Sequence, residues 1–250
     1  MKNRAYKNYI FDFYGTLVDI LTDEKDPVLW DKLGQLYQAY GAAYEGDVLK
    51  KAYAKRVDQA RKELIELKGV AYPEIDLAHI FNQLYVDARP QSSNSNQPED
   101  WGQLIAMVFR VLSRKHVTAY PHTKEVLAFL KEQGCRIYLL SNAQAAFTNA
   151  EIDLMALRPY FDAIYLSSDA GICKHQPEFL KQVLDDHGLN PSETVMIGND
   201  LTTDIAVAEA VGIDSILLNT FPYSRRELEN SPIKPDRVIT DIETLKTNFT

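Results

Sequence analysis

The sequence is poor in cysteine and contains no long hydrophobic run. Its two cysteines, Cys135 and Cys173, are too few for a disulfide framework in 250 residues, which favours a reduced, cytoplasmic compartment. No apolar stretch approaches the ~20 residues of a membrane-spanning helix. The N-terminus also lacks an apolar segment followed by a small-residue cleavage site. We therefore expect no membrane partner and no signal peptide.

Positive charge is also scarce. The chain has 27 lysines and arginines against 35 acidic residues, a net charge of −8, and no run of five basic residues. A surface of that sign repels phosphate backbones, so we expect no nucleic-acid partner. The glycine-rich dinucleotide fingerprint, the Walker-type phosphate loop and the GxSxG serine motif are all missing, which argues against the enzyme classes that depend on them.

What is present is an alternation of short apolar runs with helical patterns. Helical spacing separates several of the runs, as at residues 179–187 and 204–211. This order is typical of right-handed crossovers between parallel strands. The sequence therefore predicts an α/β fold with a Rossmann-like parallel sheet. The expected strands are residues 9–11, 136–140, 164–166, 194–197 and 215–218.

A long, mainly helical segment interrupts this pattern after its first strand. Apolar residues recur at three or four positions in several windows between residues 21 and 118, with a polar, turn-rich loop at residues 89–100. We predict an α/β core domain formed by residues 1–20 and 119–250, and a helical cap domain formed by residues 21–118. The length suits one large domain with a smaller insertion.

Chemically capable side chains follow four of the expected strands. Taken singly, each has a simpler explanation, such as a turn former, a helix cap or a surface charge. Sites in open parallel sheets form beyond the carboxyl ends of the strands, however, and all these positions belong to that edge. The candidates are Asp12, Tyr14 and Thr16, then Ser141 and Asn142, then Lys174, and finally Asn199, Asp200 and Asp204.

This set of residues suits phosphoryl transfer. A carboxylate such as Asp12 can act as a nucleophile, but attack on an anion is opposed by charge repulsion. Lys174 and a divalent cation would reduce that repulsion, and acidic side chains at 200 and 204 suit Mg²⁺, which prefers oxygen ligands. Ser141 and Thr16 add neutral hydrogen-bond donors. We expect a small anionic substrate as the partner, because positioning and charge neutralisation dominate such catalysis.

Four ordered motifs carry a family resemblance. They are FDFYGTLVD at residues 11–19, LLSN at 139–142, Lys174 in CKHQPEF, and IGNDLTTD at 197–204. With these motifs the sequence resembles the haloacid dehalogenase-like hydrolase superfamily, in its helical-cap subfamily. His175 departs from the pattern, because a proline is usual there. The five histidines show no metal-ligand spacing, and only His122 and His175 are candidates for the rim of the site.

The resemblance implies a role for each matched residue. Asp12 would be the nucleophile that forms a covalent aspartyl intermediate, Ser141 would hydrogen-bond the transferring group, and Lys174 would balance the charge. Thr16 and Asn142 belong to the same catalytic motifs. Mg²⁺ would be held by Asp12, the Tyr14 carbonyl and Asp200, with Asp204 orienting ligands or water. Asn199 is the alternative to Asp200 as the residue that faces the metal.

Tyr14 is the departure that matters most for function. In the phosphatases of the family that the sequence resembles, this position is an aspartic acid, which protonates the leaving alkoxide and later activates water. A tyrosine at this position is similar to the dehalogenase branch, in which the halide leaves without a proton. A phenol with a pKa of about 10 can donate a proton but is a poor base. The dehalogenase branch is also metal-free and has an early arginine in its cap, whereas no arginine occurs here between Arg4 and Arg56.

Three functions follow from this mixture. The leading hypothesis is a Mg²⁺-dependent phosphatase of a small phosphorylated metabolite that acts through an aspartyl-phosphate. The second is a metal-independent 2-haloacid dehalogenase. The third is a non-catalytic binding protein with the same fold. In each case we expect a monomer or a homodimer.

Overall fold

The computed structural model describes residues 5–89 and 98–249. Its main sheet has six parallel strands in the order β5-β4-β1-β6-β7-β8. This confirms the predicted α/β class with a parallel sheet. The strands are β1 (Asn8–Phe11), β4 (Arg136–Ser141), β5 (Ala163–Leu166), β6 (Thr194–Gly198), β7 (Asp214–Leu218) and β8 (Arg237–Ile239).

The central strands are apolar because helices cover both faces of the sheet. Every residue of β1 and β6 is buried. Successive side chains point to opposite faces, so Tyr9 and Phe11 join one hydrophobic cluster while Ile10 joins another. The first cluster includes residues of α5 (Thr123–Glu132), α6 (Ala145–Leu154) and η4 (Ile242–Phe249). The second includes residues of α8 (Pro177–His187) and α9 (Ala206–Val211).

Shorter elements complete the sheet connections. They lie where the chain turns between the strands and the larger helices. Most are too short to add much core of their own, and the π-helical turn after β6 is the one that bears on the site. These elements are η1 (Arg158–Tyr160), α7 (Ser167–Ala170), η2 (Pro191–Glu193), η3 (Leu201–Ile205) and α10 (Arg225–Asn230).

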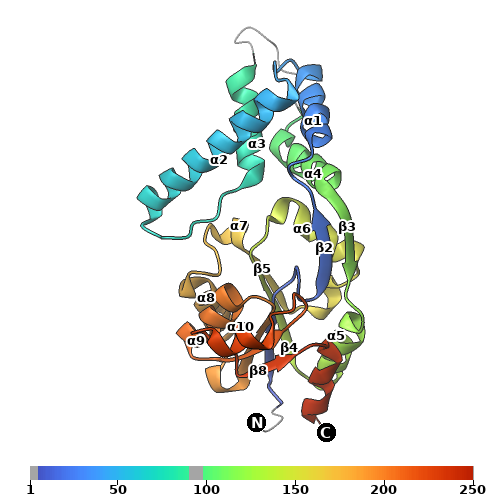
Figure 1. Cartoon of the computed structure of the whole chain (residues 1–250), viewed down its shortest axis with the longest axis vertical. Helices are drawn as coiled ribbons and strands as arrows, with labels where there is room; N and C mark the ends of the chain where they lie inside the picture. The colour runs from blue at the N-terminus through green and yellow to red at the C-terminus, as the bar shows by residue number, and fades with distance from the viewer. Residues whose placement is uncertain (1–4, 90–97, 250) are drawn as a thin grey trace.

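The predicted helices of the interrupting segment are also present. Together they lie at the end of the molecule opposite both termini (Figure 1). They enclose an aromatic-rich cluster of their own, with Trp30, Tyr37, Phe81 and Trp101 at most 2% exposed. We call these four helices the inserted helices. They are α1 (Pro27–Ala39), α2 (Gly46–Lys68), α3 (Leu77–Ala88) and α4 (Trp101–Ser113).

A two-stranded antiparallel ribbon connects the inserted helices to the sheet. It pairs β2 (Val18–Thr22) with β3 (Arg114–Ala119). Sequence analysis did not identify β3, because its sequence RKHVTA is largely polar. The predicted boundaries after residues 20 and 118 fall inside this ribbon, and the division into two domains stays a prediction.

Two further expectations from the sequence concern the loop within the insertion and membrane-spanning helices. In the predicted loop at residues 89–100, residues 90–97 lie outside the described residues. No helix in the described part of the chain is both long enough and apolar enough to cross a membrane. The cytoplasmic location and the oligomeric state stay predictions.

A core truncation tests whether the inserted helices form their own domain. Leu33 in α1 is fully buried among them, so Leu33→Ala should lower the free energy of unfolding by about 2–5 kcal/mol. Val48→Ala on α2, where the side chain is 51% exposed, is the control and should change it by less than about 0.5 kcal/mol. Urea unfolding followed by circular dichroism measures both.

Hydrogen exchange then locates the effect. In the Leu33→Ala protein we expect faster amide exchange in α1–α4 and unchanged exchange in β1 and β6, because separate cores open separately. Equal acceleration throughout the six-stranded sheet would contradict the two-domain prediction.

Candidate active site

The candidate residues meet beyond the carboxyl ends of three adjacent strands. Asp12 directly follows β1, Ser141 ends β4, and Asp204 lies in η3 just after β6. Since β4 and β6 flank β1 in the sheet, these three side chains converge on one point. Lys174 reaches the same point from the segment between α7 and α8.

Lys174 bridges two carboxylates in the interior. Its Nζ lies 2.5 Å from Asp12 Oδ1 and 2.6 Å from Asp204 Oδ1, and the three side chains are only 3%, 7% and 1% exposed. Burial alone would lower the pKa of Lys174, but the two carboxylates raise it above its ordinary value. Burial raises the pKa of Asp204, against the opposing effect of Lys174. Two carboxylates and one ammonium leave an excess of negative charge, which favours a bound cation.

Two hydroxyl groups orient the Asp12 carboxylate. Thr16 Oγ1 lies 3.0 Å from Asp12 Oδ2 and 3.2 Å from Asn199 Oδ1, so its single proton serves one acceptor at a time. Ser141 Oγ donates to Asp12 Oδ1 at 3.3 Å. Asn142 contributes to this network indirectly. Its Oδ1 accepts the backbone N–H of Lys174 at 2.7 Å and so fixes the segment that carries the lysine.

Asn199 and Asp200 point in different directions. Oδ1 of Asp200 accepts the backbone N–H groups of Thr202 and Thr203 at 2.6 and 3.2 Å, so this carboxylate caps η3. The Asn199 amide packs on Gly15, whose φ is +83° and where a Cβ would lie 2.5 Å from Asn199 Nδ2. The structure thus brings Asn199 into the network around Asp12, and it uses one oxygen of Asp200, Oδ1, to cap η3.

Some oxygen donors at this end of the sheet suit a hard cation. The Asp12 carboxylate and the Asn199 amide oxygen both lie within hydrogen-bond distance of the Thr16 hydroxyl. With the backbone carbonyl of Tyr14, two residues after Asp12 in the sequence, they are the kind of ligands that Mg²⁺ prefers. Asp204 is more constrained, because its Oδ1 accepts from Lys174 and its Oδ2 accepts the Asp200 N–H at 3.1 Å. Both of its oxygens therefore accept hydrogen bonds, and the orienting role that the resemblance implies stays a prediction.

The side chain of Tyr14 leaves this network. Its hydroxyl donates to Glu151 of α6 and lies 3.1 Å from Thr148 Oγ1. Burial raises the pKa of Tyr14 well above its usual range, an effect that Arg110 opposes and Glu151 reinforces. A phenol that is buried and already bonded to a carboxylate is a poor proton donor to a leaving group.

Sequence reasoning missed the charged residues around Tyr14. Glu151 accepts a bidentate pair of hydrogen bonds from Arg110 of α4, at 2.8 and 3.0 Å, and a third from Arg114 at 2.8 Å. A signal was available, since Arg110 is the single charged residue of the largely apolar helix WGQLIAMVFRVLS. Its partner on α6 could not be found without the tertiary structure.

The loop between α2 and α3 supports the segment that carries Lys174. The Cys173 N–H donates to the Tyr72 carbonyl at 3.0 Å, and the Glu74 N–H donates to the Gly171 carbonyl at 3.2 Å. The Tyr72 ring stacks on His175 with centroids 4.6 Å apart. His175 therefore lies at the border of the site, where the insertion meets the sheet domain.

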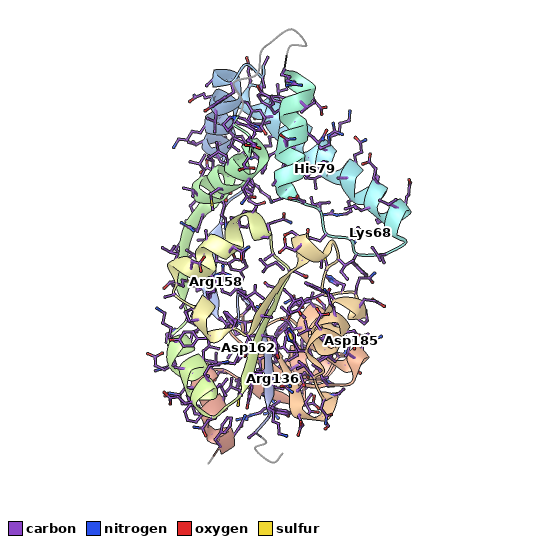
Figure 2. All side chains as sticks on the ribbon, turned by 180° about the vertical axis from the view of Figure 1, so that it is seen from behind. Lys68, His79, Arg136, Arg158, Asp162 and Asp185 are labelled. Carbon is purple, nitrogen blue, oxygen red and sulfur yellow. The ribbon has the colours of Figure 1, made fainter. Side chains whose placement is uncertain are left out.

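A groove of about 580 Å³ lies between α2, α3 and α7. Lys68 and His79, labelled in Figure 2, lie along its walls with Asp76 and Asp169. The residues that line it do not include Asp12 or Lys174, so this groove is separate from the Asp12 network.

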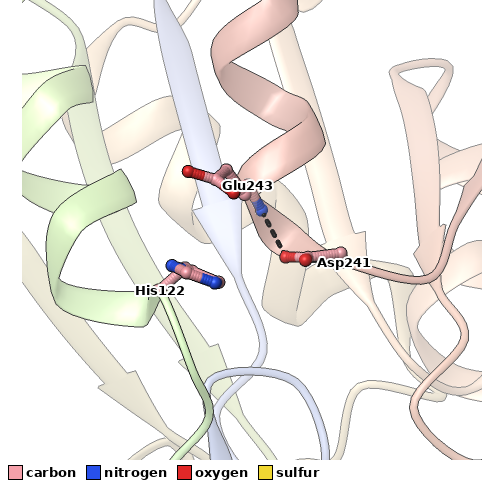
Figure 3. A group of neighbouring side chains, drawn as sticks. All are labelled: His122, Asp241 and Glu243. Atoms are coloured by element: carbon pink, nitrogen blue, oxygen red, sulfur yellow. Dashed lines mark hydrogen bonds between the residues drawn. The ribbon is translucent and has the colours of Figure 1, made fainter.

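His122 belongs to a different cluster, shown in Figure 3 with Asp241 and Glu243. All three are exposed, and their ligand atoms lie within 4.8 Å of one another. Asp241 Oδ1 already accepts the Glu243 N–H at 2.8 Å, and Glu243 pairs with Lys246. Since ordinary helix capping and a surface ion pair account for both acids, we assign no metal to this cluster.

The sequence matches a known family of hydrolases. Residues 6–212 match the sequence profile of the haloacid dehalogenase-like hydrolases. The chain is 31% identical over 105 residues to a ribulose-1,5-bisphosphate 5-phosphatase of Halopiger xanaduensis, over 42% of this chain and 44% of that protein. It is 26% identical over 227 residues to a pyrimidine 5'-nucleotidase of Streptococcus pneumoniae, over 90% and 86% of the two chains. The match thus spans less than half of the first relative and most of the second.

Solved structures show the same fold. A 2-haloacid dehalogenase from Pseudomonas syringae pv. Tomato DC3000 superposes with a TM-score of 0.65 at 19% identity, over 98% of both chains. At 19% identity, this similarity supports a shared fold only. It extends across the inserted helices as well as the sheet, because nearly the whole of each chain is covered.

Replacing Lys174, whose positive charge lies between Asp12 and Asp204, tests the charge balance of the site. Lys174→Met would leave the buried carboxylates of Asp12 and Asp204 facing each other, so it should cost about 3–5 kcal/mol of stability at neutral pH. The deficit should shrink as the pH falls through the range in which Asp204 takes up a proton, and it should level off at higher pH, where this carboxylate is fully ionised. The pKa of Asp204 is already raised in the folded state, and protonation favours the folded form of such a group.

Urea unfolding at several pH values measures this effect. The matched control is Lys181→Met on the exposed face of α8, which should change stability by less than about 0.5 kcal/mol. Equal stabilities of the two variants would show that the bridge contributes nothing to the fold.

Proposed function

The chain belongs to the haloacid dehalogenase-like hydrolase family, and on that premise we propose that it is a Mg²⁺-dependent phosphatase of a small phosphorylated metabolite. One observation carries the proposal. The Asp12 carboxylate lies at a strand end with Lys174 Nζ at 2.5 Å and the hydroxyls of Ser141 and Thr16 on its two oxygens. Such an arrangement orients a carboxylate nucleophile and offsets the charge of an anionic substrate.

The reaction follows from these contacts. An Asp12 oxygen attacks phosphorus, and the bond from phosphorus to the leaving oxygen breaks as the aspartyl-phosphate forms. Water then attacks the same phosphorus, which releases inorganic phosphate, restores the Asp12 carboxylate and returns the water proton to solvent. Ser141 donates a hydrogen bond to a transferring oxygen, and Lys174 balances the charge that accumulates.

The metal would be held by residues that already surround Asp12. The candidates are Asp12 itself, the Tyr14 carbonyl and either Asn199 or Asp200, with Asp204 orienting the set. The Asn199 contact with Thr16 supports Asn199 as the third ligand. When bound, Mg²⁺ supplies positive charge that neutralises the phosphoryl oxygens.

Tyr14 limits which esters such an enzyme can cleave. Tyr14 stands where the family's phosphatases carry an acid, and its proton is directed at Glu151. An alkoxide leaves poorly without a proton, whereas phenolates and carboxylates leave readily. We therefore propose aryl or acyl phosphates as the favoured substrates.

A metal-independent 2-haloacid dehalogenase is the second candidate. Two observations favour it: the side chain that faces the Asp12 network is the neutral Asn199 in place of an acid, and Arg110 supplies a buried arginine near Tyr14. In that reaction an Asp12 oxygen displaces halide from carbon, and water then hydrolyses the ester at the Asp12 carbonyl. Leaving halide needs no proton, so the orientation of Tyr14 is no obstacle.

Leaving-group dependence tests the leading proposal. With Mg²⁺ present, we expect kcat/KM for 4-nitrophenyl phosphate to exceed that for glycerol phosphate by about 10²–10⁴, the usual contribution of a missing general acid. Asp12→Asn should abolish turnover, whereas Asp58→Asn, on the exposed surface of α2, should leave it unchanged. The release of inorganic phosphate measures the rate for both substrates and both variants. Failure to release phosphate from any ester would contradict the proposal.

Chelation separates the candidates. For a Mg²⁺-dependent phosphatase, EDTA should remove phosphatase activity, added Mg²⁺ should restore it, and 2-chloropropionate should release no chloride. Chloride release that persists in EDTA would establish the dehalogenase instead. If Asp12→Asn retains ligand binding and the unmodified chain turns over neither class of substrate, the non-catalytic interpretation is correct.

A further inference from the structure

A buried cluster of charges joins an inserted helix to the loop that follows Asp12. Glu151 of α6 accepts hydrogen bonds from Arg110 of α4 and from Arg114 at the start of β3, and it also accepts the Tyr14 hydroxyl. Arg110 is 7% exposed and Glu151 is 2% exposed. Three segments that are distant in the sequence therefore meet at one carboxylate: the loop after Asp12, the junction of α4 and β3, and α6.

The cluster is built for fixed geometry. A buried carboxylate is costly unless it is paired, and Glu151 receives one bidentate guanidinium and a second single one. The Arg110 guanidinium also lies over the rings of Tyr14 and Phe147, at 5.1 and 4.6 Å from their centroids. Such a network is satisfied in one arrangement of α4 against α6, and displacement of α4 would leave Glu151 underpaired.

Tyr14 transmits this arrangement to the nucleophile. It lies two residues after Asp12 in a tight loop, in which the Gly15 N–H donates to the Val18 carbonyl at 2.7 Å. Thr16, the residue after Gly15, donates a hydrogen bond from its hydroxyl to Asp12 Oδ2 at 3.0 Å. The same loop continues into β2, which pairs with β3 and so leads back to Arg114. A displacement of α4 would thus affect Asp12 in two ways: through Glu151 and Tyr14, and through the ribbon of β2 and β3.

We propose that Arg110 and Glu151 are positioning residues that couple the docking of helix α4 to the alignment of Asp12 through the Tyr14 hydroxyl. This proposal rests on the proposed role of Asp12 as the nucleophile. The aligned state of the Asp12 loop then depends on the inserted helices being seated. Small misplacements of a reacting group cost up to about 10²-fold in rate, so the coupling acts on kcat more than on KM.

Two variants interrupt the coupling at different points. Glu151→Gln keeps the size of the side chain and removes the charge that Arg110 and Arg114 share. Tyr14→Phe leaves the ion pairs in place and removes only the hydroxyl that contacts Glu151. The matched control is Asp153→Asn on the same helix, which breaks the exposed pair with Arg158 on the outer surface of the molecule (Figure 2).

Hydrogen–deuterium exchange gives a readout that does not depend on activity. We expect Glu151→Gln to accelerate amide exchange in α4 and also in residues 13–18. Tyr14→Phe should accelerate exchange in residues 13–18 while α4 stays close to the unmodified protein. Asp153→Asn should change neither segment. If Glu151→Gln does not fold, Tyr14→Phe still tests the link to the Asp12 loop.

Kinetics on the aryl phosphate provide the second readout. Both variants should lower kcat by about 10–100-fold with a smaller change in KM, and the double variant should lose no more than Glu151→Gln alone. Arg110→Lys, which keeps the charge but loses the bidentate geometry, should recover part of the rate lost in Arg110→Met.

The proposal is overturned if residues 13–18 exchange at the unmodified rate in both variants, because the cluster would then stabilise α4 and α6 only. Additive losses in the double variant would overturn it as well. A chain that turns over no phosphate ester would contradict the proposed function alone, since the exchange measurements would still decide whether α4 and the Asp12 loop are coupled.

Discussion

The site depends on one buried ammonium group. Lys174 sits between Asp12 and Asp204 with almost no exposure of any of the three side chains. Charges removed from water in this way remain stable only when they are close and well aligned. The ends of β1 and β6 and the segment before α8 must therefore keep their relative positions. Asn142 and the loop between α2 and α3 serve that requirement, because both bond to the backbone around Lys174.

Much of this arrangement could be predicted from the order of the sequence. Parallel strands bring their carboxyl ends to one edge, so the residues after four apolar runs were expected to meet there. The structure does bring Asp12, Ser141, Lys174 and Asp204 together. The direction of neighbouring side chains could not be predicted in the same way. Asn199 and Asp200 differ by one position, and the start of η3 decides which of them turns toward Asp12.

The charged cluster around Glu151 lay beyond sequence reasoning for a different reason. Arg110 and Arg114 lie on either side of the junction of α4 and β3, whereas Glu151 lies in α6, and no spacing rule in the sequence connects Glu151 to the two arginines. An arginine within an apolar helix did carry information, because such a residue must find a partner when it is buried. The identity of the partner depends on how α4 packs against α6, which is a property of the tertiary structure.

Tyr14 links the chemistry of the site to the packing of the inserted helices. An aspartate at this position has a much shorter side chain than tyrosine and could not span to Glu151, and its negative charge would add to that of Glu151. The buried cluster is therefore matched to a tyrosine, while the protonation of an alkoxide would need an acid there. A tyrosine whose hydroxyl donates to Glu151 is not available as a proton donor to a leaving group. The proposed dependence on good leaving groups and the proposed coupling of α4 to the Asp12 loop thus both involve the Tyr14 hydroxyl.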